Sequence, residues 1–292
     1  MSINNLLKVI KPKTPKVYKN KKLNTANFGD FNHTDYQVFL HLISKIGGVD
    51  SNSKYLQPEQ LQRENTLTAK EFSEIFNIAT SNSYVVLKRA VDKLMKTDIR
   101  IEKPDESGYW RINICSQAEY NKKEGCISVK FTDDIMPYLA QVKQKFVLYN
   151  LKEISNFGSL YTTRLYELIQ GYKETGWMLK SVKQLREAFA VGEYKFKAYK
   201  DFKLRTFDHA CQEINANYNM NLNFEEIKEG RKVTAVRFTF KKSTVKQVTN
   251  NLTGITSNVY SKHKKKQPQN NKISSNISDV LEGQLSLLEV IK

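Results

Sequence analysis

The sequence lacks any run of apolar residues long enough to cross a bilayer, which takes about 20 predominantly apolar residues. The short stretch Leu6–Ile10 is followed at once by charged residues, so it does not resemble the core of a signal peptide. Cysteine is also scarce. Cys115, Cys126 and Cys211 form no close pair and have no metal-ligand spacing, which favours a reducing compartment. The sequence therefore predicts a cytoplasmic protein without a membrane segment.

Patterns that carry catalysis or hold a cofactor are missing as well. No Gly-x-x-x-x-Gly-Lys-Ser/Thr stretch is present to cradle a phosphate. No His-x-His pair is present of the kind that holds the metal of a rolling-circle nickase. The four histidines are His33, His41, His209 and His263. We therefore predict no catalytic residue, no metal and no cofactor.

Positive charge, by contrast, is abundant. The 292 residues include 47 Lys and Arg against 30 Asp and Glu, which gives a net charge of +17. A charge this positive favours a polyanionic partner, because each contact of Lys or Arg with a phosphate releases condensed counterions. The alternative is a soluble basic protein whose lysines are merely solvated. The apolar fraction of 40% is enough for the cores of two domains.

Residues 181–240 have the order of a winged helix-turn-helix. Ser181-Val-Lys-Gln184 matches a capping box and predicts a short helix that ends near Phe189. A turn through Gly192 then precedes a second helix over about residues 198–216. The predicted buried face of that helix comprises Leu204, Phe207, Cys211 and Ile214.

Two alternating segments, Met220–Ile227 and Lys232–Phe240, then predict a hairpin around the Gly-containing turn Lys228-Glu-Gly-Arg231. A helix fits the major groove while surrounding basic residues hold phosphates. The predicted DNA-binding residues of this part of the chain are Lys195, Lys197, Lys200, Lys203, Arg205, His209, Arg231 and Lys232. Glu213 and Asn215 are interpreted as structural.

The first half of the chain repeats this order. A helix over Thr34–Ile46 precedes a second capping box, Thr68-Ala-Lys-Glu71, and a turn at Thr80–Ser83 leads to a helix that ends near Lys96. That last helix is expected to bury Tyr84, Leu87, Val91 and Leu94. Three strands are then predicted at Ile99–Glu102, Tyr109–Cys115 and Cys126–Phe131. The basic residues that correspond to those of the second half are Arg89, Lys93 and Lys96. The pattern indicates two winged helices in tandem, although any capped helix pair would look similar.

Five short stretches of the second half resemble iteron-binding plasmid replication initiators in order and approximate spacing. They are Arg164-Leu-Tyr-Glu-Leu168, Leu185-Arg186, Tyr199-Lys-Asp-Phe-Lys203, Glu213-Ile-Asn215 and Gly230-Arg-Lys-Val233. The resemblance is specific over residues 148–240 and loose over residues 30–138. It implies binding of double-stranded DNA at origin repeats, strand opening, and recruitment of the host helicase and sliding clamp. It also implies a monomer–dimer equilibrium, with dimers formed through the first domain repressing the protein's own gene.

The fold class is therefore expected to be α+β, with four segments along the chain. Residues 1–29 are predicted to be a flexible basic arm, residues 30–145 and 146–242 the two winged-helix domains, and residues 243–292 a disordered tail. A helix over Asp134–Gln144 is expected to join the domains, and Asp50–Thr66 is expected to be a polar loop or a short irregular helix. A helix over Ser159–Tyr172 is expected to begin the second domain.

The last residues of the tail resemble the short peptide by which bacterial replication proteins dock on the sliding clamp. The predicted partner-binding residues are Gln284, Leu285, Leu287 and Leu288. An apolar peptide on a long tether suits capture of a partner, and a terminal amphipathic turn is the alternative. Two other functions stay open at this point: a winged-helix transcriptional regulator, and an origin nickase whose active site the sequence does not reveal.

Overall fold

In the computed structural model, the structure describes residues 15–46, 56–103, 105, 107–140, 146–192 and 194–241. These residues group into two compact units. The first unit contains the described residues up to Gly171 together with Arg186–Glu213, and the second contains Tyr172–Leu185 and the described residues from Ile214 onward. Within the ranges above, no helix is both long and apolar enough to cross a membrane.

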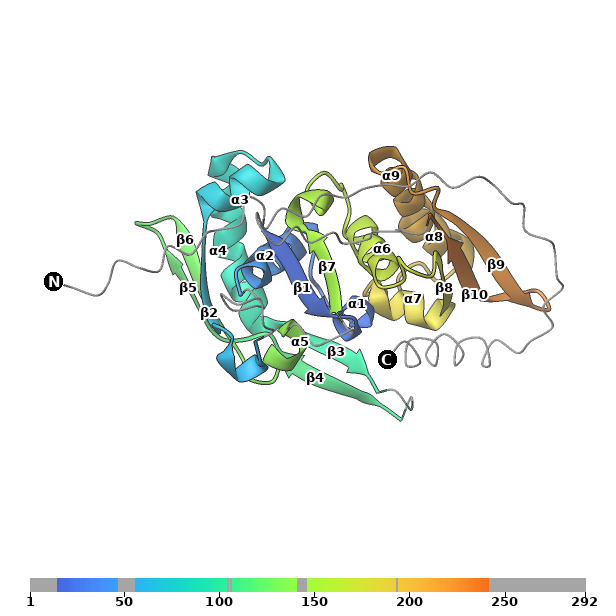
Figure 1. Ribbon diagram of the computed structural model, residues 1–292, viewed down its shortest axis with the longest axis horizontal. Helices are drawn as coiled ribbons and strands as arrows, with labels where there is room; N and C mark the ends of the chain where they lie inside the picture. The colour runs from blue at the N-terminus through green and yellow to red at the C-terminus, as the bar shows by residue number, and fades with distance from the viewer. Residues whose placement is uncertain are drawn as a thin grey trace, which may run out of the picture. The chain divides into compact units, whose positions relative to one another are not determined.

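The first winged helix lies within the first unit (Figure 1). Its elements in chain order are α2 (His33–Ser44), β2 (Glu64–Thr68), α3 (Ala69–Phe76), α4 (Thr80–Lys96), β5 (Cys115–Asn121) and β6 (Cys126–Phe131). The three strands form an antiparallel sheet in the order β2-β6-β5. A separate hairpin of β3 (Asp98–Glu102) and β4 (Tyr109–Asn113) is inserted between α4 and β5.

The second winged helix has the same topology. Its elements in chain order are α6 (Leu160–Gln170), β8 (Trp177–Ser181), α7 (Val182–Ala188), α8 (Tyr199–Lys203), a π-helical turn η3 (Leu204–Asp208), α9 (His209–Asn217), β9 (Asn223–Glu229) and β10 (Lys232–Thr239). The strands are ordered β8-β10-β9, so in each domain the last strand lies between the first and the middle one. The predicted α+β fold with two tandem winged helices is confirmed.

Both predicted capping boxes are present and begin the second helix of their domains. In the first domain, the Glu71 amide donates to the Thr68 hydroxyl at 3.1 Å, and the Thr68 amide donates to the Glu71 carboxylate at 2.9 Å. In the second domain, the amides of Ser181 and Gln184 donate to each other's side chains, each at 3.1 Å. Local hydrogen bonding therefore fixes both helix starts where the sequence indicates them.

The predicted flexible arm over residues 1–29 is wrong for its second half. Lys16–Asn20 form strand β1, which pairs antiparallel with β7 (Phe146–Asn150), and α1 (Lys22–Thr25) follows it. Val17, Leu23 and Phe28 are buried. Figure 1 shows β1 and β7 side by side next to α2. Residues 1–14 lie outside the described part of the chain.

Three further elements differ from expectation. Of the joining helix predicted over Asp134–Gln144, the described residues 134–140 contain only the single turn α5 (Met136–Leu139), and the next described element is β7, which begins at Phe146. The described part of Asp50–Thr66 contains the short 3-10 helix η1 (Pro58–Gln60), in line with the expected short irregular helix, but its last residues belong to strand β2. The Thr80–Ser83 turn is the first turn of α4 itself.

Two side chains that were expected to be buried are exposed. Tyr84 is 42% exposed, and its ring lies over Gly125, where an added Cβ would clash with it. Leu204 is 56% exposed, because the π-helical turn η3 shifts the face of the helix by one residue. The side chains that fill the core from this helix are Phe202, Thr206, Phe207, Ala210, Cys211 and Ile214.

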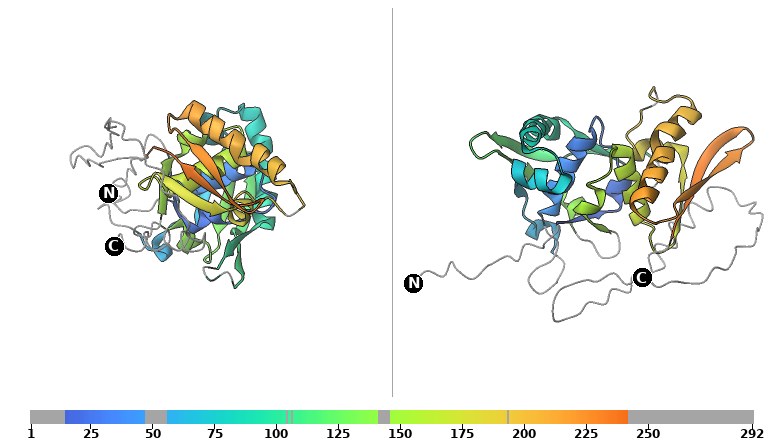
Figure 2. Two further views of the ribbon diagram at one scale, coloured as in Figure 1. Left: turned by 90° about the vertical axis from the view of Figure 1, so that its right-hand side faces the viewer. Right: turned by 90° about the horizontal axis from the view of Figure 1, so that it is seen from above.

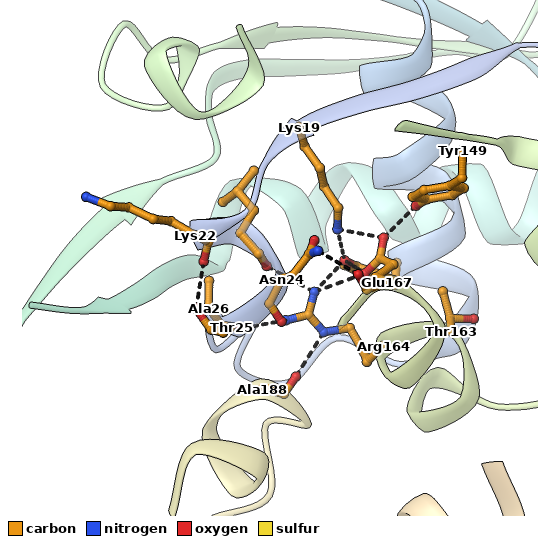
Figure 3. A network of polar contacts seen from close by, with 12 residues as sticks. Lys19, Lys22, Asn24, Thr25, Ala26, Tyr149, Thr163, Arg164, Glu167 and Ala188 are labelled. Atoms are coloured by element: carbon orange, nitrogen blue, oxygen red, sulfur yellow. Dashed lines mark hydrogen bonds and ion pairs between the residues drawn. The ribbon is translucent and has the colours of Figure 1, made fainter. Parts of the chain in front are cut away.

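A buried polar network lies at the centre of the first unit, around helix α6 (Figure 3). Arg164, only 2% exposed, donates to the carbonyls of Leu23, Asn24 and Ala26 at 2.7–3.1 Å. It also donates to the carbonyl of Ala188 at 2.9 Å. Its fifth N–H donates to the hydroxyl of Tyr36 at 2.6 Å, so all the N–H groups are used, as a fully buried guanidinium requires.

Glu167, one turn along α6 from Arg164, completes the network. Its carboxylate accepts from the hydroxyls of Tyr36 and Tyr149 and pairs with the ammonium of Lys19. The network therefore joins the N-terminal strand β1 to α2, β7 and α6, and through Ala188 to the end of α7.

Candidate nucleic-acid interface

The third helix of the second winged-helix domain is continuous from Tyr199 to Asn217, in agreement with the predicted range of about 198–216. Its centre is the π-helical turn η3, which holds one more residue than an α-helical turn. A π turn loosens the regular ladder, and here the hydroxyl of Thr206 donates to the carbonyl of Phe202 at 2.6 Å. The buried ring of Phe202 packs against those of Phe189 and Phe207, with ring centroids 6.3 and 5.8 Å apart.

The outer face of this helix carries the predicted recognition residues. Lys200, Arg205 and His209 are exposed, and Lys203 is half-buried. Among the described residues, no carboxylate pairs with Lys200 or Arg205 in an ion pair, so their charges are available to a ligand. The guanidinium of Arg205 lies 5.8 Å from the ring centroid of Phe196, which holds the side chain near the start of the helix.

The turn between α7 and α8 is organised by Arg186. Its guanidinium donates to the carbonyls of Gly192 and Lys195 at 3.3 and 3.0 Å, and to that of Phe196. Ala190 and Phe196 both adopt positive φ angles, 52° and 53°, so the backbone is tightly turned at each end of this loop. Arg186 belongs to one of the stretches that carry the family resemblance, which predicted no role for it. Its hydrogen bonds show that it holds this turn.

Two of the predicted basic residues lie on this turn beside aromatic rings. The Lys195 ammonium is 5.7 Å from the ring centroid of Tyr161, and the Lys197 ammonium is 5.6 Å from that of Tyr194. Both lysines are exposed, and Tyr194 is 86% exposed. The turn therefore extends the basic surface of the helix toward its N-terminal end.

Glu213 and Asn215 have the structural roles that the sequence indicated. The Glu213 carboxylate accepts from the amide of Gly158 at 2.6 Å and from the hydroxyl of Thr162, at the N-terminal end of α6. Asn215 exchanges two hydrogen bonds of 2.8 Å with the backbone of Leu222. Both side chains are thus used within the fold, and neither is assigned to DNA contact.

The hairpin of β9 and β10, orange in Figure 2, belongs to the second unit. Gly230 and Arg231 form its two-residue loop between the paired residues Glu229 and Lys232. Gly230 has a φ angle of 60° whereas that of Arg231 is negative, which is the pattern of a type II′ turn. Arg231 and Lys232 are exposed at the tip, as expected for a wing.

The basic residues of the first domain are placed differently. Arg89 donates to the carboxylate of Asp35 at 3.0 Å and to the hydroxyl of Thr34 at 2.6 Å, which ties α4 to the start of α2. With Lys93 and Lys96 it lines a hollow of about 310 Å³ that also contains Asp30, Asp35 and Asp92. Three aspartates thus lie among the three basic side chains, so this surface is far less positive than that of the second domain.

No group of three or more metal-ligating side chains occurs in the described residues. His33 and His41 are largely buried, and burial lowers the pKa of each imidazole to about 4. The cysteines are free and buried, and burial raises the pKa values of Cys115 and Cys211 to about 11 and about 12. The predicted clamp-binding residues Gln284–Leu288 lie outside the described residues.

Comparisons with known proteins agree with this domain organisation. The family model described as "Initiator Replication protein, WH1" matches residues 16–170, and the model described as "Initiator Rep protein, WH2" matches residues 181–240. The first of these alone covers more than half of the chain. The segment that it matches begins at β1, in line with the ordered strand found there.

Two curated relatives from Escherichia coli are similar to the chain. A "Replication initiation protein" is 26% identical over 171 residues, which are 57% of this chain and 50% of the relative. The chain thus spans about half the length of that relative. A "PI protein" is 24% identical over 258 residues, which are 76% of this chain and 83% of that protein.

A solved structure of the Pi initiator protein in complex with iteron DNA has the same fold. The match has a TM-score of 0.64 at 24% sequence identity and covers 79% of this chain and 98% of the other.

Proposed function

Because the chain belongs to the family of initiator replication proteins with WH1 and WH2 winged-helix domains, we propose that it is a plasmid replication initiator that binds iterons, the repeated DNA sites of an origin. Proteins of this family act by binding DNA and are not catalytic. The observation that carries the proposal is the exposed basic face of the helix from Tyr199 to Asn217, whose Lys200 and Arg205 have no carboxylate partner among the described residues. The iteron complex of the related Pi protein supports the same ligand.

The proposed contacts divide into two kinds. Arg205, with His209 further along the helix, reads base edges in the major groove, since Arg can donate two hydrogen bonds to guanine. Lys195, Lys197, Lys200 and Lys203 hold phosphates around that helix. Arg231 and Lys232 at the hairpin tip contact the backbone or the minor groove.

The first domain has a smaller share in DNA binding under this proposal. Lys93 and Lys96 contact phosphate from the edge of the hollow. The negative charges of the three neighbouring aspartates weaken this contact, because they repel the phosphate. Arg89 is used mainly in holding the start of α2 through Asp35 and Thr34. We further propose that the chain dimerises through this domain and that the dimer represses the protein's own gene.

We also propose that the bound initiator opens the origin and recruits host helicase and sliding clamp, the latter through Gln284, Leu285, Leu287 and Leu288. This part is supported by the sequence of the tail and by the family alone.

A footprint of the purified full chain on the DNA that flanks its gene tests the proposal, in the absence of metal and nucleotide. Several protected direct repeats, spaced by about whole helical turns, are the expected result. A single inverted repeat over a promoter would instead identify a transcriptional regulator. Strand cleavage on addition of magnesium would identify a nickase and overturn the proposal.

A further inference from the structure

The structure describes every residue of the helix from Tyr199 to Asn217. Leu204 is the only large apolar side chain of this helix that is exposed. Its exposed fraction is 56%, whereas Phe202 and Phe207 on either side of it are completely buried. A single exposed leucine on an ordinary surface needs no explanation. Leu204, however, lies on the helix that carries the basic face.

The π-helical turn is the reason for this exposure. Leu204 stands three and seven residues before Phe207 and Cys211, a spacing that would place it in the core of a regular α-helix. The turn η3 begins at Leu204 itself and inserts one residue, so that Phe202 and Thr206 fill the core instead. Leu204 is thereby displaced onto the outer face.

The neighbours of Leu204 on that face are charged. Lys200, Asp201 and Arg205 are all exposed. Lys200 and Arg205 can donate to base edges and phosphates, and the Asp201 carboxylate can accept from a base amino group. Leu204 can gain energy only by burying its surface against an apolar group. The major groove offers one apolar group on the base edges of unmodified DNA, the C5 methyl of thymine.

We propose that Leu204 is a specificity-determining residue that packs on the C5 methyl group of a thymine within the bound repeat. The inference rests on the proposed function, since it places this helix in the major groove. It adds a selection for thymine beside the polar reading by Arg205, and it gives the π-helical turn a role in recognition.

Deoxyuridine in place of thymidine tests the inference, because the exchange removes only the methyl group. Duplexes of a footprinted repeat carry this exchange at one thymidine at a time, and their affinities for the full chain are measured by fluorescence anisotropy at fixed salt. At one or two of the thymidine positions, the exchange is expected to weaken binding about fourfold, which is the effect of burying one methyl-sized apolar group. The Leu204→Ala variant is expected to bind the thymidine duplex about fourfold more weakly and to respond no further to those exchanges.

Two variants serve as controls. Gln212→Ala changes another exposed residue of the same helix and should keep the full response to deoxyuridine. Leu204→Met keeps an apolar side chain and should keep most of the response to deoxyuridine. Urea denaturation verifies that each variant is folded. An unchanged response to deoxyuridine in Leu204→Ala, or no response in the unmodified chain, would overturn the inference alone. Failure of the unmodified chain to bind any repeat would instead overturn the proposed function.

Discussion

The ammonium nitrogen of Lys19 lies 2.6 Å from the Oε1 atom of Glu167, and both side chains are completely buried. Burial lowers the pKa of the Lys19 ammonium to about 7, in opposition to the attraction of Glu167. Burial by itself would raise the pKa of the Glu167 carboxyl, yet the charges of Lys19 and Arg164 hold it below its ordinary value. At and above neutral pH Glu167 is therefore ionised, and Lys19 is the member of the pair that titrates there.

This pair makes the stability of the fold depend on pH in a predictable direction. The pKa of Lys19 is about 7 in the folded chain against 10.5 as the ordinary value, so the unfolded chain binds more protons between these limits. The contribution of Lys19 to the free energy of unfolding should therefore rise with pH across that window, whereas the buried thiols of Cys115 and Cys211 oppose it above about pH 9, where they ionise only in the unfolded chain. Lys19→Met should abolish this rise while leaving Glu167 paired with Arg164. Urea denaturation at several pH values measures the free energy of unfolding of both proteins. Parallel pH profiles of the two proteins would contradict the titration of Lys19 in this window.

Arg164→Lys is expected to destabilise the first unit strongly. A lysine has three donors on one nitrogen and cannot reach the carbonyls on both sides of the guanidinium, from Leu23 to Ala188. Buried carbonyls would lose their partners, at a cost of about 3–5 kcal/mol, as for other broken buried charge networks. The matched exchange Arg205→Lys, on the exposed helix face, should change the free energy of unfolding by no more than about 0.5 kcal/mol. Equal urea midpoints for the two variants would rule out the proposed role of Arg164.

Arg205→Ala is expected to weaken binding to the footprinted repeat by about 1–3 kcal/mol and to relax the base preference at one position. Binding to random DNA should change much less. Competition titrations against both DNA types measure the difference. Lys70→Ala, which removes one positive charge from the exposed surface of α3, is the control for a change in net charge. An equal loss on both DNA types would make Arg205 a phosphate contact.

Glu213→Ala removes the side chain that caps the N-terminal end of α6 through Gly158 and Thr162. The loss of such a cap costs about 0.5–2 kcal/mol, which thermal denaturation should detect as a lower melting temperature. Glu74→Ala, at an exposed position of α3, should leave the melting temperature nearly unchanged. Loss of DNA affinity at a temperature where the Glu213→Ala variant is fully folded would show that Glu213 does more than support the helix.

Replacement of Leu287 and Leu288 by Ala tests the proposed clamp-binding peptide. DNA affinity should stay unchanged, whereas capture of the purified sliding clamp on immobilised initiator should be lost, because both apolar anchors are gone. A variant with Ala in place of Ser286 alone is the matched control and should keep the interaction. Clamp capture that survives the double replacement would refute the proposal for the tail.

Features set by neighbouring residues could be predicted from the sequence. The two capping boxes each depend on side chains three residues apart, and the hairpin turn depends on Gly230. The repeated order of helices and strands followed from these signals, as did the exposed basic face with Lys200 and Arg205.

Features set by distant partners could not be predicted. Strand β1 is short and basic, and its partner β7 begins 126 residues after β1 ends, so its own pattern gives no hint of pairing. The burial of Lys19 depends on Glu167, which lies 148 residues further along the chain. The displaced Leu204 had a regular helical spacing, and only the π-helical turn reveals that it faces outward. Arg164 and Arg186 stood in the family motifs, but their structural roles depend on carbonyls that no motif contains.

The hydrogen bonds of Arg164 also bear on the order in which a nascent chain can complete its fold. Its carbonyl partners in residues 23–26 leave the ribosome some 140 residues before it does, whereas Ala188 follows 24 residues later. A fragment that ends at residue 170, where the first family segment stops, leaves the Nε donor of Arg164 without its partner. Expression of the first domain alone should therefore succeed better when the chain is extended past Ala188 than when it is cut at the family boundary.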